Sequence, residues 1–370
     1  MFGSRPSTFL GKRGVGLMSL SKQSAKRFVY SLAFLIGAGL CLANGAACSD
    51  NTSSAESGQV GQKVPQSEQS ASGNSTQLAK NNKAQKAVKN SESVSQEDKG
   101  EQLNKQVITL ATWNLENFFD TVDDPYNDDV LTEAEYGDKL TRVSSVLQEV
   151  NADIVGIEEI ENAQVISDLS KRSGYPYYVL IPGNDRTRGI NVGVLSKVPV
   201  RNTVSHIQDR FTQKDGKRSS VFSRDCLEVH FKHKSNFTLL VNHFKSKRGG
   251  AKTDAKRIAQ SNRVKEIARS LSSYPVAICG DLNDTPDAKT LRPLLSCNFL
   301  TDVLGHLPEV ERRSFFNTRY QSALDYILVN NKLKPAIVPG SAKVCADIPE
   351  IEKASDHRPV KVVMDLSKIK

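Results

Sequence analysis

The 370-residue sequence carries a formal net charge of +9, but charged and apolar residues are unevenly distributed along it. Residues 1–105 hold 13 Lys and Arg against 7 Asp and Glu, a net charge of +6, which leaves +3 for residues 106–370. The overall basicity therefore does not indicate nucleic-acid binding by the remainder. That remainder, about 265 residues, is long enough for one sizeable α/β domain with a substantial core.

The first residues have the order of parts of an export signal. Three basic residues precede an apolar run over 28–43, and a small-residue stretch, NGAAC, follows it. The run is too short for a comfortable transmembrane span. Cys48 resembles the lipidated cysteine of a bacterial lipoprotein cleavage site, and simple cleavage with release is the alternative. We expect a signal peptide over residues 1–48 with a possible lipid anchor at Cys48.

The next segment, residues 49–105, is rich in Ser, Gln, Asn, Lys and Gly and has almost no large apolar side chains. Such a segment cannot bury enough surface to fold, so we expect a disordered polar tether. Together with the signal, the tether predicts an exported protein. It would be either a cell-envelope lipoprotein, periplasmic or on the outer surface, or a secreted protein.

From residue 106 onward, strand and helix patterns alternate. Strands are predicted at 107–113, 153–159, 190–196, 225–231, 237–244, 275–279, 323–329 and 358–366. Helices are predicted ahead of residue 150, over 253–271, and as a short segment within 287–295. Because few helices separate the strands between 190 and 244, we expect an antiparallel meander there. The pattern is compatible with two mainly antiparallel sheets packed face to face with helices outside, a four-layer α/β sandwich, although periodicity alone does not select it.

Four cysteines lie in the expected domain: Cys226, Cys279, Cys297 and Cys345. An even number in an exported protein permits two disulfides, and buried free thiols are an equally good interpretation. No C-x-x-C spacing occurs, which argues against a structural zinc site.

Five polar clusters stand where predicted strands stop, which is where α/β folds place functional side chains. They are WNLEN (113–117), GIEEIEN (156–162), VNHFKSK (241–247), CGDLND (279–284) and SDHRPV (355–360).

Two of these clusters contain pairs of oxygen-bearing side chains. Strand alternation sends Glu158 and Glu159 to opposite faces, so that one points into a site while the other faces solvent or a neighbour. Taken alone, such a pair is more often a solvated strand end. Asp281 and Asn283, two residues apart, suit a hard cation such as Mg²⁺, or a phosphate with its attacking water. An Asx turn is the alternative for this second pair.

The histidines stand beside charged residues. His243 precedes the basic residues Lys245 and Lys247. Singly, such a histidine packs in the core and such a run is a solvated face, but together they suit an anion, with phosphate the obvious candidate. Asp325 lies inside an apolar strand, where a carboxylate is costly without a partner. His357 needs a partner to fix its tautomer, so we expect Asp325 to orient it.

The motifs WNLEN, EEIEN, NHFKSK, GDLND, LDYILV and SDHRPV, in this order, resemble the endonuclease/exonuclease/phosphatase superfamily over about residues 107–368. The stretches at 114–125 and 183–196 resemble a bacterial exported nuclease-like branch. The resemblance implies the four-layer sandwich and hydrolysis of phosphoric esters with Mg²⁺ or Mn²⁺.

The resemblance also implies roles for individual residues. Glu159 would be a metal ligand, Asn114 would help to place the metal and the scissile phosphate, and Asp356 would face the metal. The implied catalytic residues are His243, Asp281, Asn283, Asp325 and His357. Substrate phosphate binding is expected of Arg224, Arg188, Lys245 and Lys247. The identity of the base and the number of metal ions stay open.

The leading hypothesis is an exported, metal-dependent phosphodiesterase that hydrolyses nucleic acid, as a DNA endonuclease that could also accept RNA. The basic run after His243 favours a polyanion. The alternative is a phosphatase or phospholipase-like hydrolase of lipid or sugar phosphates. A hypothesis of another class, a non-catalytic surface lipoprotein, predicts lost site residues, and the motifs keep them. No obligate protein partner is evident.

Overall fold

The computed structural model describes residues 87–90, 105–125, 129–213, 219–317 and 319–369. The expected signal peptide, with Cys48, and most of the expected tether lie outside these residues. In the described part of the chain, no helix is both long enough and apolar enough to cross a membrane.

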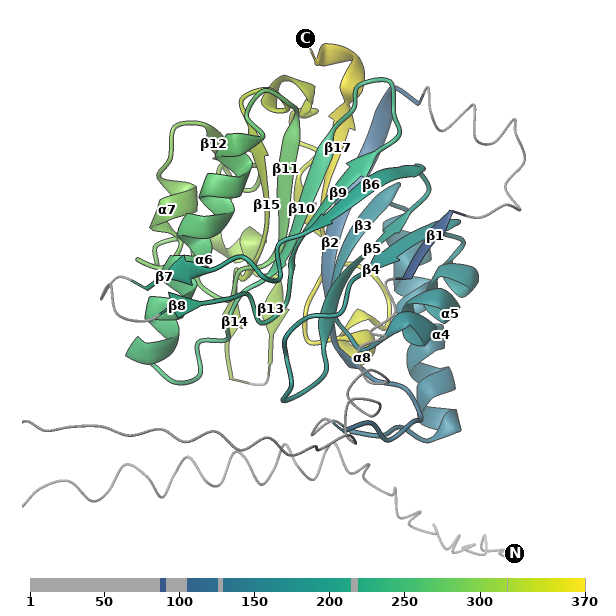
Figure 1. Ribbon diagram of the computed structural model, residues 1–370. Coiled ribbons are helices and arrows are strands. Elements are labelled where there is room, and N and C mark those ends of the chain that lie inside the picture. Colours follow the sequence, from purple (N-terminus) through teal and green to yellow (C-terminus); the bar gives the residue numbers. More distant parts are fainter. Residues whose placement is uncertain (1–86, 91–104, 126–128, 214–218, 318, 370) are drawn as a thin grey trace, which may run out of the picture. The chain divides into compact units, whose positions relative to one another are not determined.

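Seven strands form the first sheet, in the order β1-β4-β5-β3-β2-β17-β16 (Figure 1). They are β1 (Ala87–Asn90), β2 (Val107–Phe118), β3 (Ile154–Ile160), β4 (Tyr177–Leu180), β5 (Asn191–Ser196), β16 (Lys343–Val344) and β17 (Val360–Asp365). Strands β2 and β3 are parallel, and the other described neighbours are antiparallel. A parallel pair needs a crossover connection, which α4 (Glu133–Val150) supplies.

Six strands form the second sheet, in the order β12-β15-β11-β10-β9-β6. They are β6 (Val200–Ser205), β9 (Cys226–Phe231), β10 (Thr238–His243), β11 (Val276–Asp281), β12 (Leu300–Asp302) and β15 (Asp325–Asn330). Here β10 and β11 are the parallel pair, and α6 (Ala251–Ser270) connects them. Each sheet is therefore mainly antiparallel, with one parallel pair among its described strands.

Helices cover the outer face of each sheet (Figure 1). Helices α4, α5 (Ala163–Ser173) and α8 (Ile351–Ala354) pack on the seven-stranded sheet, whereas α6 and α7 (Arg292–Leu295) pack on the six-stranded sheet. A further apolar cluster fills the space between the sheets, with Val194 from the first and Leu239 from the second. The expected four-layer α/β sandwich is confirmed.

Short elements occupy the connections. Two small hairpins pair β7 (Phe211–Thr212) with β8 (Ser219–Ser220) and β13 (Phe315–Phe316) with β14 (Gln321–Ser322). The described 3₁₀ helices are η1 (Glu309–Arg312), η2 (Lys334–Ala336) and η3 (Leu366–Lys368). The β13–β14 hairpin lies beside the SDHRPV cluster, because Phe315 forms a β-bridge with His357.

Local sequence fixes where α4 and α5 begin. Thr132 Oγ1 accepts a hydrogen bond from the N–H of Glu135 at 3.2 Å, and the Glu135 carboxylate accepts one from the N–H of Thr132 at 3.0 Å. This capping box satisfies two backbone donors at the start of α4. Asn162 caps α5 through its side-chain oxygen, so the last residue of the cluster at 156–162 has a structural role.

The expected meander is wrong in one strand. Strands β9 and β10 pair antiparallel as predicted, but β5, predicted at 190–196, lies in the other sheet between β3 and β4. Every residue of β5 is buried, which requires a central position with both faces covered. The second neighbour of β9 is β6 and not β5. Sequence periodicity did not reveal β6, because most of its residues are exposed.

A four-residue part of the expected tether is ordered. Strand β1, within residues 49–105, pairs antiparallel with the edge strand β4, from Ala87 opposite Leu180 to Asn90 opposite Tyr177. An edge strand offers unpaired backbone groups to any extended segment, so apolar side chains are not needed for this pairing.

The cysteines are free thiols. Cys226, Cys279 and Cys345 are buried and Cys297 is partly buried, and none of the four forms a disulfide. The interpretation as disulfides is wrong, and the interpretation as free thiols is confirmed. The Cys279 thiol instead fills space between the sheets, since a Cβ at Gly156 would lie 2.5 Å from its Sγ.

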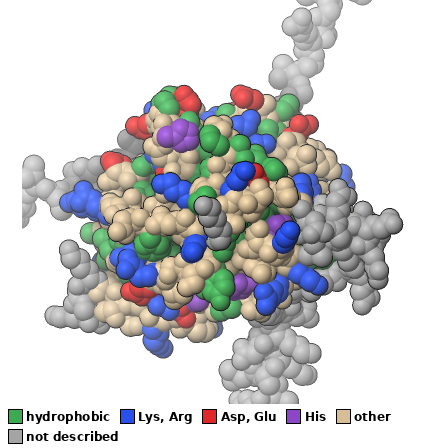
Figure 2. Space-filling view, turned by 90° about the horizontal axis from the view of Figure 1, so that it is seen from above, with side chains coloured by type: hydrophobic (Ala, Val, Ile, Leu, Met, Phe, Trp, Pro, Cys, Tyr) green, Lys and Arg blue, Asp and Glu red, His purple; other side chains and the backbone are tan. Residues whose placement is uncertain are grey.

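The two parallel pairs end at the same end of the sandwich, where Asn114 of β2 contacts Asp281 of β11. The opposite end, seen in Figure 2, carries lysine and arginine side chains scattered among hydrophobic, acidic and uncharged ones. The ends of β2, β3, β10 and β11 therefore define the candidate site.

Gly280 permits the close approach of β10 and β11 at this end. It lies opposite Asn242 with φ of 129°, and a Cβ there would be 1.8 Å from the Asn242 carbonyl oxygen. No side chain fits this position without moving one of the strands.

We expect Gly280→Ala to lower the free energy of unfolding by about 3 kcal/mol or more, because both the φ value and the contact oppose it. Urea unfolding measures this. Gly137→Ala in α4 is the matched control: a Cβ there meets nothing within 4 Å, so we expect a gain of about 0.5–1 kcal/mol. Equal stability of the two variants would contradict the strand geometry.

Candidate active site

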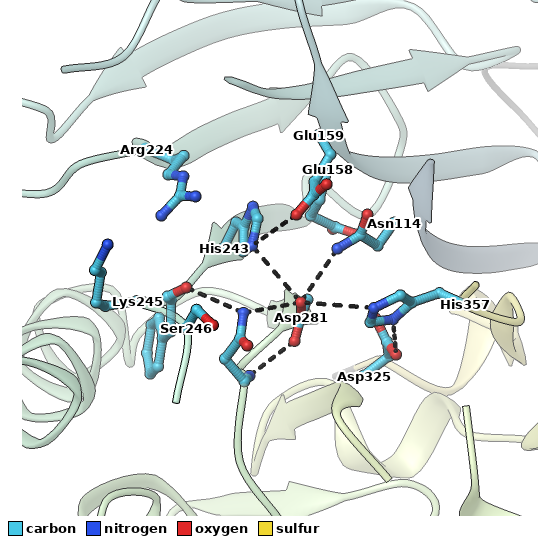
Figure 3. Close-up of polar contacts among 12 residues, drawn as sticks. Asn114, Glu158, Glu159, Arg224, His243, Lys245, Ser246, Asp281, Asp325 and His357 are labelled. Carbon is cyan, nitrogen blue, oxygen red and sulfur yellow. Dashed lines mark hydrogen bonds and ion pairs between the residues drawn. The ribbon is translucent and has the colours of Figure 1, made fainter. Parts of the chain in front are cut away.

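Asp281, the last residue of β11, lies at the centre of the polar contacts (Figure 3). Its Oδ2 accepts hydrogen bonds from Asn114 Nδ2 at 3.1 Å and from Asn283 Nδ2 at 2.9 Å. Its Oδ1 accepts one from the N–H of Asn283 at 2.8 Å, which closes an Asx turn. The GDLND segment therefore forms the turn and also places both side chains in the site.

The charge on Asp281 is only partly compensated. Burial raises the pKa of the Asp281 carboxyl to about 7, with His357 opposing the shift and Asp325 adding to it. A carboxyl group with a pKa near the working pH is suited to accept a proton during a reaction.

His357 has the partner that the sequence predicted. Its Nδ1 lies 2.8 Å from Oδ2 of Asp325, the first residue of β15. Burial alone would lower the pKa of His357, but Asp325, then Asp281 and Asp356, raise it well above its usual value. His357 is therefore protonated near neutral pH, with Nε2 4.0 Å from Asp281 Oδ2.

His243, the last residue of β10, is in the opposite state. Its Nε2 lies 3.6 Å from Glu159 Oε1 and 3.6 Å from Asp281 Oδ2. Its Nδ1 is buried and has no hydrogen-bond partner among the described residues. Burial lowers the pKa of His243 well below its ordinary value, and Arg224 lowers it further. His243 is therefore neutral and can donate one hydrogen bond without carrying charge.

Glu159 points toward the site from a distortion in β3. The pairing of β3 with β5 shifts register between Glu158 and Ile160, and Glu159 has a φ of 60°. Its Oε1 lies 3.0 Å from Arg188 Nη2, and its Oε2 accepts a hydrogen bond from the N–H of Asn117 at 3.0 Å. Burial would raise the pKa of Glu159, but the positive charges around it, above all Arg188, lower it to about 2. It is ionised.

Of the glutamate pair, Glu159 is the one that points into the site, and Glu158 faces a neighbouring strand, as one form of the expectation had it. Glu158 has no exposed surface, and Glu159 is 9% exposed. Glu158 Oε1 accepts a hydrogen bond from Thr112 Oγ1 at 2.8 Å, while its Oε2 has no partner among the described residues. Burial, followed by the charge of Asp325, raises the pKa of Glu158 well above its ordinary value.

Cations gather on one side of this cluster. Figure 3 shows Arg224 and Lys245 on the side of His243 that faces away from His357. Arg224 is buried, with its Nε 3.1 Å from Asp185 Oδ2. Burial lowers the pKa of Lys245, and Arg224 lowers it further, so the two cations interact. This arrangement suits an anion between them.

Two of the expected residues lie apart from the centre. Lys247 Nζ lies 2.7 Å from Asp284 Oδ1, and this lysine side chain is 52% exposed. Asp356 is partly exposed, with its Oδ1 3.9 Å from His357 Nε2. Both border the site from different loops.

Sequence reasoning missed two residues that hold the arginines. Asp185 pairs with Arg224, and Asn117 Oδ1 accepts a hydrogen bond from Arg188 Nη1 at 2.8 Å. Asn117 stands in the WNLEN cluster, and Asp185 stands in the stretch at 183–196. Their signal was a polar residue in a loop beside a predicted strand, which does not identify its partner.

The oxygen donors permit a divalent cation but do not form a closed cage. Among the described residues, no three His, Cys, Asp or Glu side chains are grouped closely enough to bind a metal by themselves. Mg²⁺ commonly takes one or two protein carboxylates and completes its shell with water and substrate phosphate. Glu159, ionised and beside the centre, with the Asn114 amide, fits that mode.

Comparison with protein families gives one description. A model of the endonuclease/exonuclease/phosphatase family matches residues 109–303. No curated protein gives a significant match.

Solved structures of similar fold include two of TDP2 from D. rerio. A form humanized by 14 mutations is 16% identical, and the match covers 70% of this chain and 99% of that chain with a TM-score of 0.52. A complex with a single-strand DNA product is 17% identical, with 70% and 99% covered and a TM-score of 0.51. The human Nocturnin catalytic domain with bound sulfate is 16% identical, with 70% and 94% covered and a TM-score of 0.51. Identities this low establish the fold alone.

The state of Glu158 leads to a stability prediction. The pKa of Glu158 is higher in the folded chain than its usual value of 4.5, so the free energy of unfolding falls as the pH rises above about 4.5. Glu158→Gln removes the carboxylate charge and keeps an acceptor for Thr112. We expect it to raise the melting temperature at pH 8 by about 2–4 °C for each kcal/mol recovered, and by less near pH 4.5.

Melting curves in EDTA between pH 4.5 and 8 measure this gain. Glu149→Gln on the exposed face of α4 is the control and should show no such trend. A gain that shrinks as the pH rises would show that Glu158 is stabilised as the anion.

Proposed function

The chain belongs to the endonuclease/exonuclease/phosphatase family, whose members are phosphoester hydrolases, and we propose that it is an exported, divalent-metal-dependent nuclease that cleaves DNA. The observation that carries the proposal is the division of the polar cluster. Acid–base groups lie on one side of His243 and a group of cations lies on the other. A phosphodiester needs both, since its oxygens are negative and its attacking water must lose a proton.

On the acid–base side, Asp281 accepts the proton of the attacking water in this proposal. Asn283 holds the carboxylate through two hydrogen bonds, at 2.8 and 2.9 Å, so its orientation is fixed before substrate arrives. His357, held protonated by Asp325, donates to a phosphate oxygen or to the departing oxygen. Neutral His243 donates a second hydrogen bond to the phosphate.

Glu159 and Asn114 would hold Mg²⁺ or Mn²⁺, with Asp356 at the rim. The ion would supply neutralisation of phosphate charge and stabilisation of the leaving oxygen. The ion pair between Arg188 and Glu159 at 3.0 Å keeps this carboxylate ionised. With the metal ion on Glu159, Arg188 would be available to bind the substrate phosphate.

Nucleic acid as the substrate has support outside the chain. The fold of D. rerio TDP2 holds a single-strand DNA product, and that of Nocturnin holds a sulfate anion. Within the chain, Arg224 and Lys245 provide positive charge next to the centre, in keeping with a polyanion. Export, and anchoring through a lipid on Cys48, complete the proposal and rest on the N-terminal sequence.

Supercoiled plasmid tests the function directly. We expect the purified full-length chain to nick it with Mg²⁺ or Mn²⁺ and to leave it intact in EDTA. Asp281→Asn keeps the shape of the side chain but removes the proton acceptor, so we expect turnover to fall by about 10²–10⁴-fold. Asp138→Asn, at a carboxylate that is 73% exposed on α4, is the control and should retain full turnover.

A panel of phosphomonoesters, inositol phosphates and phosphocholine lipids runs beside the plasmid. Intact plasmid with phosphate or phosphocholine released from the panel would reject the nuclease and assign the phosphatase or phospholipase-like activity. Equal nicking by wild type and Asp281→Asn would reject the assigned base.

A further inference from the structure

A polar pocket lies beside the cationic side of the site. Its volume is about 410 Å³, which is within the size range of ligand sites. Its lining is almost entirely polar or basic and consists of Asn184, Gln208, Arg210, Ser219, Ser220, Val221, Phe222, Ser223 and Lys256. Among the described residues, this lining contains two basic side chains and no carboxylate.

Covalent neighbours and a hydrogen bond join this pocket to the reaction centre. Ser223 directly precedes Arg224, and Asn184 directly precedes Asp185, the partner of Arg224 at 3.1 Å. Lys256 of α6 donates from Nζ to Ser223 Oγ at 2.8 Å, which holds the lysine over the pocket. Two lining residues of the pocket are therefore the direct chain neighbours of Arg224 and of its partner Asp185.

The pocket and the site share an excess of positive charge. Burial lowers the pKa of Lys256, and Lys245 and Arg224 lower it further, whereas Asp185 opposes the shift. Cations placed this close repel one another unless an anion joins them. A negatively charged group of the substrate can supply the anion that these cations lack.

We propose that this pocket binds a phosphate of a nucleotide next to the scissile one on the same strand, with Lys256 and Arg210 as its ligands. The inference rests on the proposed nuclease function and deepens it, because it makes the substrate a polynucleotide. A single phosphoester would fill the reaction centre and leave the pocket without an anion. A chain with several phosphates would fill both.

Equilibrium binding in EDTA tests this separately from cleavage. The probe is a fluorescein-labelled single-stranded DNA of about 12 nucleotides, followed by anisotropy with the full-length chain over a range of salt concentrations. We expect Lys256→Gln to raise Kd by about 10-fold and to reduce the slope of log Kd against log salt by about 1, as for a lost phosphate contact. Arg210→Gln should act in the same direction.

Lys256→Arg keeps the positive charge, so it should keep most of the DNA affinity and of the salt slope. If Lys256 had only a structural role, keeping its charge would not be enough to preserve them. Arg210 is exposed, so its substitution tests the pocket without endangering the fold. Lys334→Gln, at an exposed lysine in η2, is the charge-matched control. Kd and slope for Lys256→Gln and Arg210→Gln equal to those of Lys334→Gln would overturn the inference.

The two failures are distinguishable. DNA that binds with Lys256-dependent affinity but is never cut would support the pocket and reject the nuclease. If the protein cleaves plasmid but neither Lys256→Gln nor Arg210→Gln changes its affinity for DNA, the nuclease function is supported and the pocket is rejected.

Discussion

The contact between Asn114 and Asp281 joins the two sheets at the end where their parallel strands stop, and the other polar contacts are arranged around it. Asp281 and Asp325 come from the six-stranded sheet, while Asn114 and Glu159 come from the seven-stranded one. Buried carboxylates are costly alone, and Asp281 and Asp325 find partners in Asn114 and in His357, which belong to the other sheet and to the loop ahead of its strand β17. The register of one sheet against the other is therefore also the condition under which these charges are tolerated.

Environment divides the site into two electrostatic halves. Two histidines of equal chemistry take opposite charge states, because His357 has a carboxylate on its Nδ1 and His243 has none and lies near Arg224. Asp281 stands between them, and burial raises its pKa to about 7 although His357 opposes the shift. The fold thus provides a donor, an acceptor and a neutral hydrogen-bond donor within one small volume, without the need for unusual side chains.

Sequence patterns predicted the layers and much of the site, because both depend on short-range order. The apolar run around Asp325 required a partner for it, and His357 supplied one. What failed depends on long-range pairing, namely the sheet to which β5 belongs. Asp185 and Lys256 were missed because a polar residue in a loop or on a helix gives no sign of the arginine or serine that it meets.

Strand β17 has a further consequence for how the protein is made. It pairs with β2 in the interior of the seven-stranded sheet, and His357 stands just ahead of it. Strand β2 therefore cannot complete its pairing until β17, the last described strand, has been made. During synthesis, Asn114, Glu159 and Asp281 emerge long before this strand does. A chain whose synthesis stops before His357 and this strand leaves Asp325 without its histidine partner.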